Sequence, residues 1–194
     1  YDRGRKFSVD NMDNEETAGL AFGRLSSEFI RVKVAPEQDA FRFATYAGTT
    51  GISKVSAGAT LSSGNDVLTA LITAQNKMDE DEVSPENRIL YITPTLYNLA
   101  INVDTTKSKA VLDGFAKIVK VPQSRFYTAI DLKDGTTKSE GVDETAGGFA
   151  KATTAKDINF MIIQKSAVIQ YPKHTVNKVV TPDENQTDDS WLFF

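Results

Sequence analysis

The chain has 194 residues, 40% hydrophobic and 25% charged, which is ordinary for a globular protein and excludes a disordered or collagen-like chain. Its 22 basic and 26 acidic residues give a net charge of −4, and no stretch is strongly basic, which argues against a dedicated nucleic-acid reader. No cysteine is present, so disulfides and thiol nucleophiles are excluded, and no apolar run approaches the ~18–20 residues that a membrane span needs.

The first twelve residues predict an extended arm. Arg5, Phe7 and Val9 alternate with Lys6, Ser8 and Asp10, the two-residue period of a strand with little apolar surface. We expect this strand to project from the domain or to pair with another copy, because it has too few apolar groups to dock on its own core.

A long helix follows, with Asp13 or Asn14 as its cap and Glu15 and Glu16 in its first turn. Its apolar stripe is expected to belong to the core and comprises Ala18, Ala21, Phe22, Leu25, Phe29 and Val32. We expect a break before Pro36 and then a second helix, whose apolar face is Ala40, Phe41, Ala44 and Ala47. Gly19 and Gly23 have a GxxxG spacing, which indicates close helix packing or chance.

Residues 48–58 form an expected loop, and Ser63 with Asp66 forms an expected capping box for a helix that runs to about Met78. The acids Asp79 to Glu82 follow it. They lack the glycine and closing glutamate of a calcium loop, so we interpret them as a solvated helix end. Residues 88–93 predict a buried strand, and Thr93-Pro94 predicts the start of a short helix whose inner residues are Leu96, Leu99 and Ala100.

The last third of the chain is richer in strand signals. Residues 111–121 have a two-residue period, and residues 133–156 are expected to be a long, polar, mobile loop. Residues 158–171 form an apolar run broken near Gln164-Lys165, and Val176, Val179 and Val180 are expected to continue the sheet. Tyr1 and the apolar end Trp191 to Phe194 suggest an excised piece of a longer protein. The fold class is therefore α+β.

Catalytic candidates are few. His174 is the only histidine, no nucleophile elbow accompanies it, and one imidazole cannot complete a zinc shell. We expect a surface or sheet-edge histidine there. Gly-rich loops match neither the P-loop nor the dinucleotide fingerprint. We therefore expect no cofactor and no metal.

The order of parts resembles the major capsid proteins of tailed double-stranded DNA phages, which have the Hong Kong type fold. The resemblance is strongest over residues 3–47, where an extended strand (Asp2 to Asp10) and turn acids (Asp13 to Glu16) lead into a spine helix (Ala18 to Lys33) and a break (Val34 to Ala40). RILYITPTLYNLA at 88–100 is similar to the strand-to-helix step of the axial domain, and residues 158–182 to its later strands.

This resemblance implies an extended-loop arm at 1–12, a peripheral domain with the spine helix at 13–57, an axial domain at 58–175, and a truncated return to the peripheral domain at 176–194. It implies a structural subunit, not an enzyme, that assembles into hexameric and pentameric capsomers of an icosahedral head. Implied partners are scaffolding and portal proteins and, non-specifically, packaged DNA, with no membrane. The implied location is the virion, after synthesis in the bacterial cytoplasm.

A shell subunit needs charged contacts that are individually weak. The candidate contact residues are Arg3, Arg5, Lys6, Glu15, Glu16, Arg24, Glu28 and Arg31. One alternative is a non-viral nanocompartment shell protein of the same fold. Another is a hydrolase that uses carboxylates alone, although nothing in the sequence pairs two acids in an apolar setting.

Overall fold

The computed structural model describes residues 3–54, 58–139, 141–171 and 178–193. The chain divides into two compact units, one made of Tyr1–Gln38 and Gln170–Phe194 and the other of Asp39–Ile169. These two units divide the chain after residues 38 and 169, and the sequence-based domain boundaries at 57 and 175 stay a prediction. His174 and Val176 lie outside the described residues.

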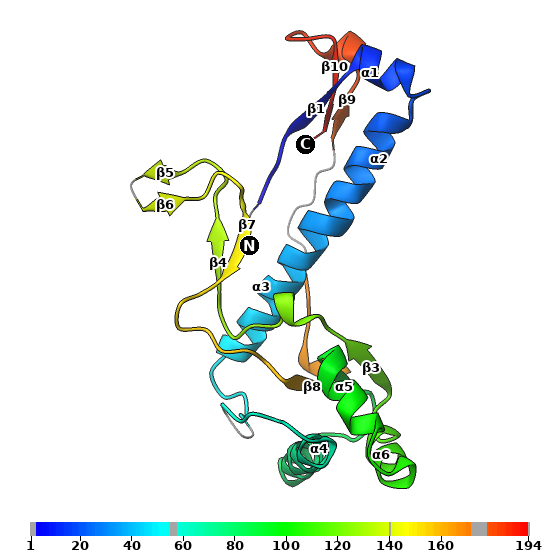
Figure 1. Cartoon of the computed structure of the whole chain (residues 1–194), viewed down its shortest axis with the longest axis vertical. Coiled ribbons are helices and arrows are strands. Elements are labelled where there is room, and N and C mark those ends of the chain that lie inside the picture. The colour runs from blue at the N-terminus through cyan, green and yellow to red at the C-terminus, as the bar shows by residue number, and fades with distance from the viewer. Residues whose placement is uncertain (1–2, 55–57, 140, 172–177, 194) are drawn as a thin grey trace. The chain divides into compact units, whose positions relative to one another are not determined.

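The first unit holds a three-stranded antiparallel sheet in the order β1-β10-β9 (Figure 1). Its strands are β1 (Phe7–Asp10), β9 (Val179–Val180) and β10 (Ser190–Phe193), with a 3-10 turn, η4, at Pro182–Glu184. β1 pairs with β10 of the same chain, with Phe7 opposite Phe193. Residues 7–10 therefore do not project from their unit, because the Phe7 ring gives the strand an apolar anchor, whereas pairing of this edge strand with another copy stays a prediction.

The helical part of this unit begins earlier than expected. Asp10, not Asp13 or Asn14, caps α1 (Asn11–Glu16) by accepting the Met12 amide at 2.9 Å. A turn with left-handed backbone at Ala18 and Gly19 separates α1 from α2 (Leu20–Phe29). Gly19 therefore supplies a turn rather than a close helix contact, and a Cβ at Gly23 would meet nothing within 4 Å.

Pro36 does not break the helix. A π-helical turn, η1 (Ile30–Val34), leads directly into α3 (Ala35–Gly48), and the Ala35 amide bonds to the Ile30 carbonyl five residues earlier. The wider turn accommodates a residue that has no N–H and whose ring would clash with the carbonyl four positions back. The predicted stop is thus replaced by a local change in helical pitch.

The second unit contains a mixed sheet in the order β3-β2-β8. The central strand β2 (Arg88–Ile92) is parallel to β3 (Lys117–Lys120) and antiparallel to β8 (Phe160–Gln164), which ends at a 3-10 turn, η3 (Lys165–Ala167). Three helices contact one another beside it: α4 (Gly64–Glu80), α5 (Pro94–Ile101) and α6 (Thr105–Leu112). A further 3-10 turn, η2, spans Gln123–Arg125.

Two apolar clusters form the core of this unit. Val67, Leu71, Leu90 and Ile92 are fully buried in the larger one, and Leu96 and Ala100 join them from α5, as expected. The smaller cluster contains Phe43, Val121, Phe126 and Ile158. Phe43 is thus the buried aromatic of α3, whereas the expected Phe41 is only half-buried.

Several local predictions for this unit are confirmed. The Ser63–Asp66 capping box is present in both directions, and Thr93 precedes a helix that starts at Pro94. Two other predictions are wrong.

The first concerns the strand expected over residues 111–121. Residues 105–112 form helix α6, which is capped by the Asp104 carboxylate through the Thr106 and Lys107 amides. The strand that follows, β3, therefore starts only at Lys117.

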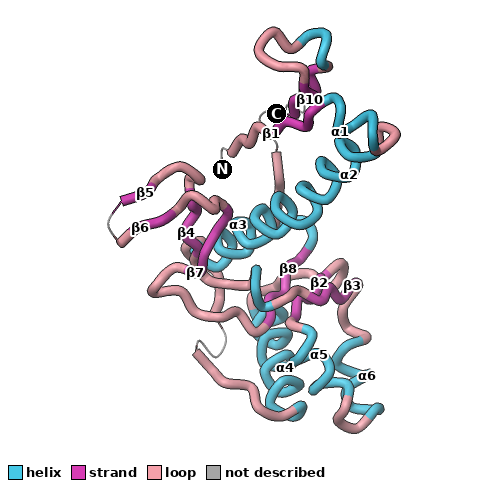
Figure 2. Tube along the Cα trace, turned by 45° about the horizontal axis from the view of Figure 1, so that its top comes forward, coloured by secondary structure: helices cyan, strands magenta, loops and turns pink. Residues whose placement is uncertain are grey.

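The second correction concerns residues 133–156, which are not a structureless loop. β4 (Ile130–Lys133) pairs with β7 (Gly148–Lys151), and β5 (Lys138–Ser139) pairs with β6 (Val142–Asp143). The two pairs follow one another along a single ribbon (Figure 2). Thr137 and Thr145 donate hydrogen bonds to Asp134 and Asp143 in turns of this ribbon. Such turns order a polar segment that has little apolar surface to bury.

Candidate interaction surface

The first unit buries almost no apolar side chain. Among its described residues, Leu192 is the one buried hydrophobic residue, and Asn14, Glu37 and Ser190 are the buried polar ones. α2 contains no buried residue. The expectation that Phe22, Leu25 and Phe29 are core is therefore wrong, since Leu25 is 45% exposed and both phenylalanines are half-buried.

An aromatic cluster holds α2 on the sheet. Phe22 lies 5.6 Å from the Trp191 ring, and Phe29 lies 5.4 Å from Phe7, which stacks on Phe193 at 5.0 Å. The Trp191 indole also donates to the Asn11 side chain at 3.3 Å. These contacts involve one side of α2. The apolar stripe therefore predicts correctly which side of the helix faces the sheet, but not how deeply its side chains are buried.

Large apolar side chains of this unit remain exposed. They are Met12, Leu20, Leu25, Ile30, Val32, Tyr171 and Val179. Isolated exposed apolar residues are common, but five of these seven fall within residues 12–32. Such a concentration on a unit with hardly any core is typical of a surface that is covered in an assembly.

Charged groups lie along the same helix. Leu20, Arg24, Glu28 and Arg31 share one exposed side, because they follow one another at three- and four-residue spacing. Arg31 donates two hydrogen bonds to Glu28, both at 2.7 Å. The hydrogen bonds from Arg31 hold the pKa of the Glu28 carboxyl below its usual value, and the same bonds raise the pKa of Arg31.

The predicted contact residues therefore fall into two groups. Arg24, Glu28 and Arg31 lie together on α2 and η1, whereas Arg5, Lys6, Glu15 and Glu16 are exposed on the arm and α1. Arg3 differs from the others because it bonds to Glu37 at 2.8 and 3.4 Å. That pair ties the arm to the start of α3 and makes Arg3 a structural residue first.

Sequence reasoning missed Asp13 and Lys33, which are exposed beside members of the candidate set. The signal was available as charge runs. Residues 10–16 contain four acids and no base, and residues 30–34, IRVKV, contain two bases and no acid. Charge is thus segregated along this part of the chain, beyond the individual helix-spaced pairs.

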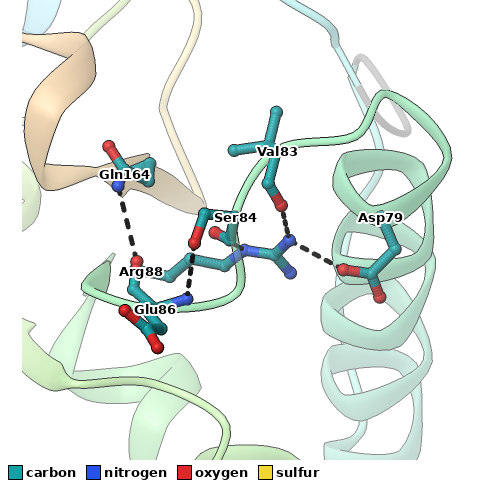
Figure 3. Close-up of polar contacts among 6 residues, drawn as sticks. All are labelled: Asp79, Val83, Ser84, Glu86, Arg88 and Gln164. Carbon is teal, nitrogen blue, oxygen red and sulfur yellow. Dashed lines mark hydrogen bonds and ion pairs between the residues drawn. The ribbon is translucent and has the colours of Figure 1, made fainter.

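The Asp79–Glu82 run is part of a structural contact in the second unit. Arg88, which is 3% exposed, donates to Asp79 at 2.7 Å and to the Ser84 carbonyl at 3.0 Å, and it also bonds to the Val83 carbonyl (Figure 3). Lys77 bonds to Asp81 at 2.7 Å. Within the described residues no group of histidine, aspartate or glutamate could hold a metal ion.

One hollow in the second unit, of about 420 Å³, lies at the start of α5 and is lined by uncharged residues: Thr93, Pro94, Thr95, Leu96, Pro122, Gln123 and Asn159. None of these side chains is an acid or base that titrates near neutral pH. The helices that the structure describes include none long and apolar enough to cross a bilayer.

Comparison with known proteins gives no match: no family model fits the chain, and no curated protein or solved structure is significantly similar to it. What the structure establishes of the expected fold is its mixed α+β class. A functional assignment therefore depends on the residues of this surface and their geometry.

Proposed function

We propose that this chain is a shell subunit, specifically the major head protein of a tailed double-stranded DNA phage, which acts by self-association rather than by catalysis. One observation carries the proposal. The unit that contains α2 has one buried apolar residue among those described, yet it exposes apolar and charged side chains along its helices. A surface of this kind gains stability when copies cover one another.

The resemblance of residues 3–47 to the phage head proteins supports the viral form of this proposal. The strand β1, the acids of α1 and a helix that begins at Leu20 occur in the order that the resemblance implies, but a π-helical turn that leads on into α3 stands where the resemblance implies a break at Val34 to Ala40. Hexameric and pentameric capsomers, scaffolding and portal partners and a place in the virion belong to the same proposal.

The test is assembly. The gene product, expressed with its genomic neighbours in the bacterial host, should sediment in a sucrose gradient as large particles that negative-stain microscopy resolves as isometric shells. Heads filled with DNA would support the phage assignment. Small shells that are empty or loaded with protein cargo would instead favour a nanocompartment. A chain that stays monomeric under all these conditions would contradict both.

A further inference from the structure

Two stretches of the first unit carry opposite charge. Residues 10–16, here named the acidic stretch, contain four acids and no base. Residues 24–33, the basic stretch, contain three bases and one acid, a net charge of +2. The acidic stretch comprises Asp10, the cap of α1, and α1 itself, whereas the basic stretch lies on α2 and η1, beyond the turn at Ala18 and Gly19.

Apart from Glu28 and Arg31, the charged side chains of the two stretches have no ion-pair partner among the residues that the structure describes. Among the described residues, Asp13, Glu15 and Glu16 make no ion pair, and neither do Arg24 and Lys33. The one pair within the two stretches joins Glu28 to Arg31. All four acids of the acidic stretch and all three bases of the basic stretch are exposed.

Each stretch also offers an apolar contact. Met12 is 68% exposed within the acidic stretch, and Val32 is 49% exposed within the basic stretch. An exposed apolar side chain among charges that are mostly of one sign fits a partner surface that has an apolar group and charges mostly of the other sign. The chain itself carries both surfaces.

We infer that the acidic stretch of one copy docks on the basic stretch of a second copy, so that subunits associate head to tail. This inference rests on the proposed function only in taking the partner to be another copy of the chain. Because the two surfaces differ, each contact leaves one stretch of each kind unused, and further copies can join until a ring closes. Apolar burial supplies attraction, and charge complementarity supplies register and partner choice.

The test uses two charge-reversed variants of the whole chain. Glu15→Lys with Glu16→Lys gives a subunit with two basic surfaces, and Arg24→Glu with Lys33→Glu gives one with two acidic surfaces. Neither variant removes a residue with an ion pair described above. Each alone should associate at least about tenfold more weakly than wild type in sedimentation velocity, whereas an equimolar mixture should recover association.

Two controls make the result specific. Lys107→Glu with Lys109→Glu changes the same amount of charge on α6, in the second unit, and should leave association near the wild-type value. Association of the wild type should also weaken as ionic strength rises from about 0.01 to about 1 M, because the Debye length falls from about 30 to about 3 Å. Circular dichroism checks that each variant folds.

Any of three results overturns the inference: reversed variants that associate like wild type, a mixture of folded variants that does not associate, or a closed dimer as the largest species. Electron microscopy tests the proposed shell separately from the head-to-tail contact. Head-to-tail oligomers without closed shells would leave the inference standing and contradict the shell. Normal shells from both reversed variants would support the shell and overturn the inference.

Discussion

Arg88 and Asp79 join the start of the central strand β2 to the last turn of α4, with 2.7 Å between guanidinium and carboxylate. The two side chains are unequally buried, since Arg88 is 4% exposed and Asp79 is 58% exposed. The arginine also bonds to the Val83 and Ser84 carbonyls. The buried cation is thereby satisfied, and it closes the turn between helix and strand.

We predict that Arg88→Met costs far more stability than Asp79→Asn. Removing the guanidinium deletes its bonds to the Val83 and Ser84 carbonyls and to Asp79 together, a loss of about 3 kcal/mol, whereas Asp79→Asn weakens one half-exposed contact by about 1 kcal/mol. Urea unfolding followed by far-ultraviolet circular dichroism measures both. Equal losses would show that Asp79, not the carbonyls, is the main partner.

Two helical glycines should respond to alanine with opposite signs. A Cβ at Gly64, the first residue of α4, would lie 2.2 Å from both the Leu99 carbonyl oxygen and the Val103 side chain, so Gly64→Ala must push α5 away. A Cβ at Gly23 would meet nothing within 4 Å, so Gly23→Ala should stabilise the chain by about 0.5–1 kcal/mol through helix propensity. Thermal unfolding of both variants tests this, and a stabilising Gly64→Ala would contradict the close approach of α4 and α5.

Three truncations should rank by burial. Leu71→Ala removes a fully buried side chain of α4 and should cost about 3–5 kcal/mol. Phe22→Ala removes a half-buried ring from the aromatic cluster and should cost about 1–2 kcal/mol, while Leu25→Ala should stay within about 0.5 kcal/mol. Trp191 fluorescence reports the first unit and circular dichroism the whole chain. A loss at Leu25 as large as that at Phe22 in the unassembled chain would refute the exposed placement of Leu25.

The ribbon should lose local order in acid. Thr137 donates to Asp134 from its side chain and its amide, and Thr136 donates from its amide, which together hold the pKa of Asp134 well below its usual value. A lowered folded pKa contributes stability that is present above the unfolded pKa, about 3.9, and is lost as pH falls below it towards the folded pKa.

Amide exchange at Thr136 and Thr137, followed by NMR, should therefore stay protected at neutral pH and lose protection only well below about pH 4. In Asp134→Ala this dependence on pH should vanish, while the remote turn at Asp66 serves as an internal control. A carboxyl titration centred near the ordinary value of about 3.9 would contradict the turn geometry.

Sequence reasoning succeeded where both partners of an interaction lie within a few residues. Ser63 and Asp66 cap α4 reciprocally, and Thr93-Pro94 fixes the start of α5, because these signals need no distant partner. It failed at α6, where the alternation in 111–121 is compatible with a strand but Asp104 caps a helix that runs through Leu112.

Burial on α2 failed for a different reason. A helical stripe indicates which side faces a partner, but not how large that partner is. The partner here is a sheet of three short strands, so Phe22 and Phe29 are only half covered, and Leu25 at the edge of the stripe is exposed. The sequence likewise does not reveal the distant partners of the candidate contact residues. It predicts that Arg24, Glu28 and Arg31 share one side of a helix, but not that Arg3 bonds to Glu37.

Arg3 and Arg5 provide the last prediction, because two neighbouring arginines of the arm have different surroundings. Arg3→Glu places a carboxylate against that of Glu37, which is 11% exposed, and should destabilise the subunit by about 2 kcal/mol. Arg5 is exposed, so Arg5→Glu should change stability by no more than about 0.5 kcal/mol. If the arm contacts other copies, Arg5→Glu nevertheless blocks assembly, since a small loss repeats at every contact of a shell. Circular dichroism beside sucrose-gradient sedimentation separates the two effects. Folded Arg5→Glu subunits that form normal shells would remove Arg5 from the interface.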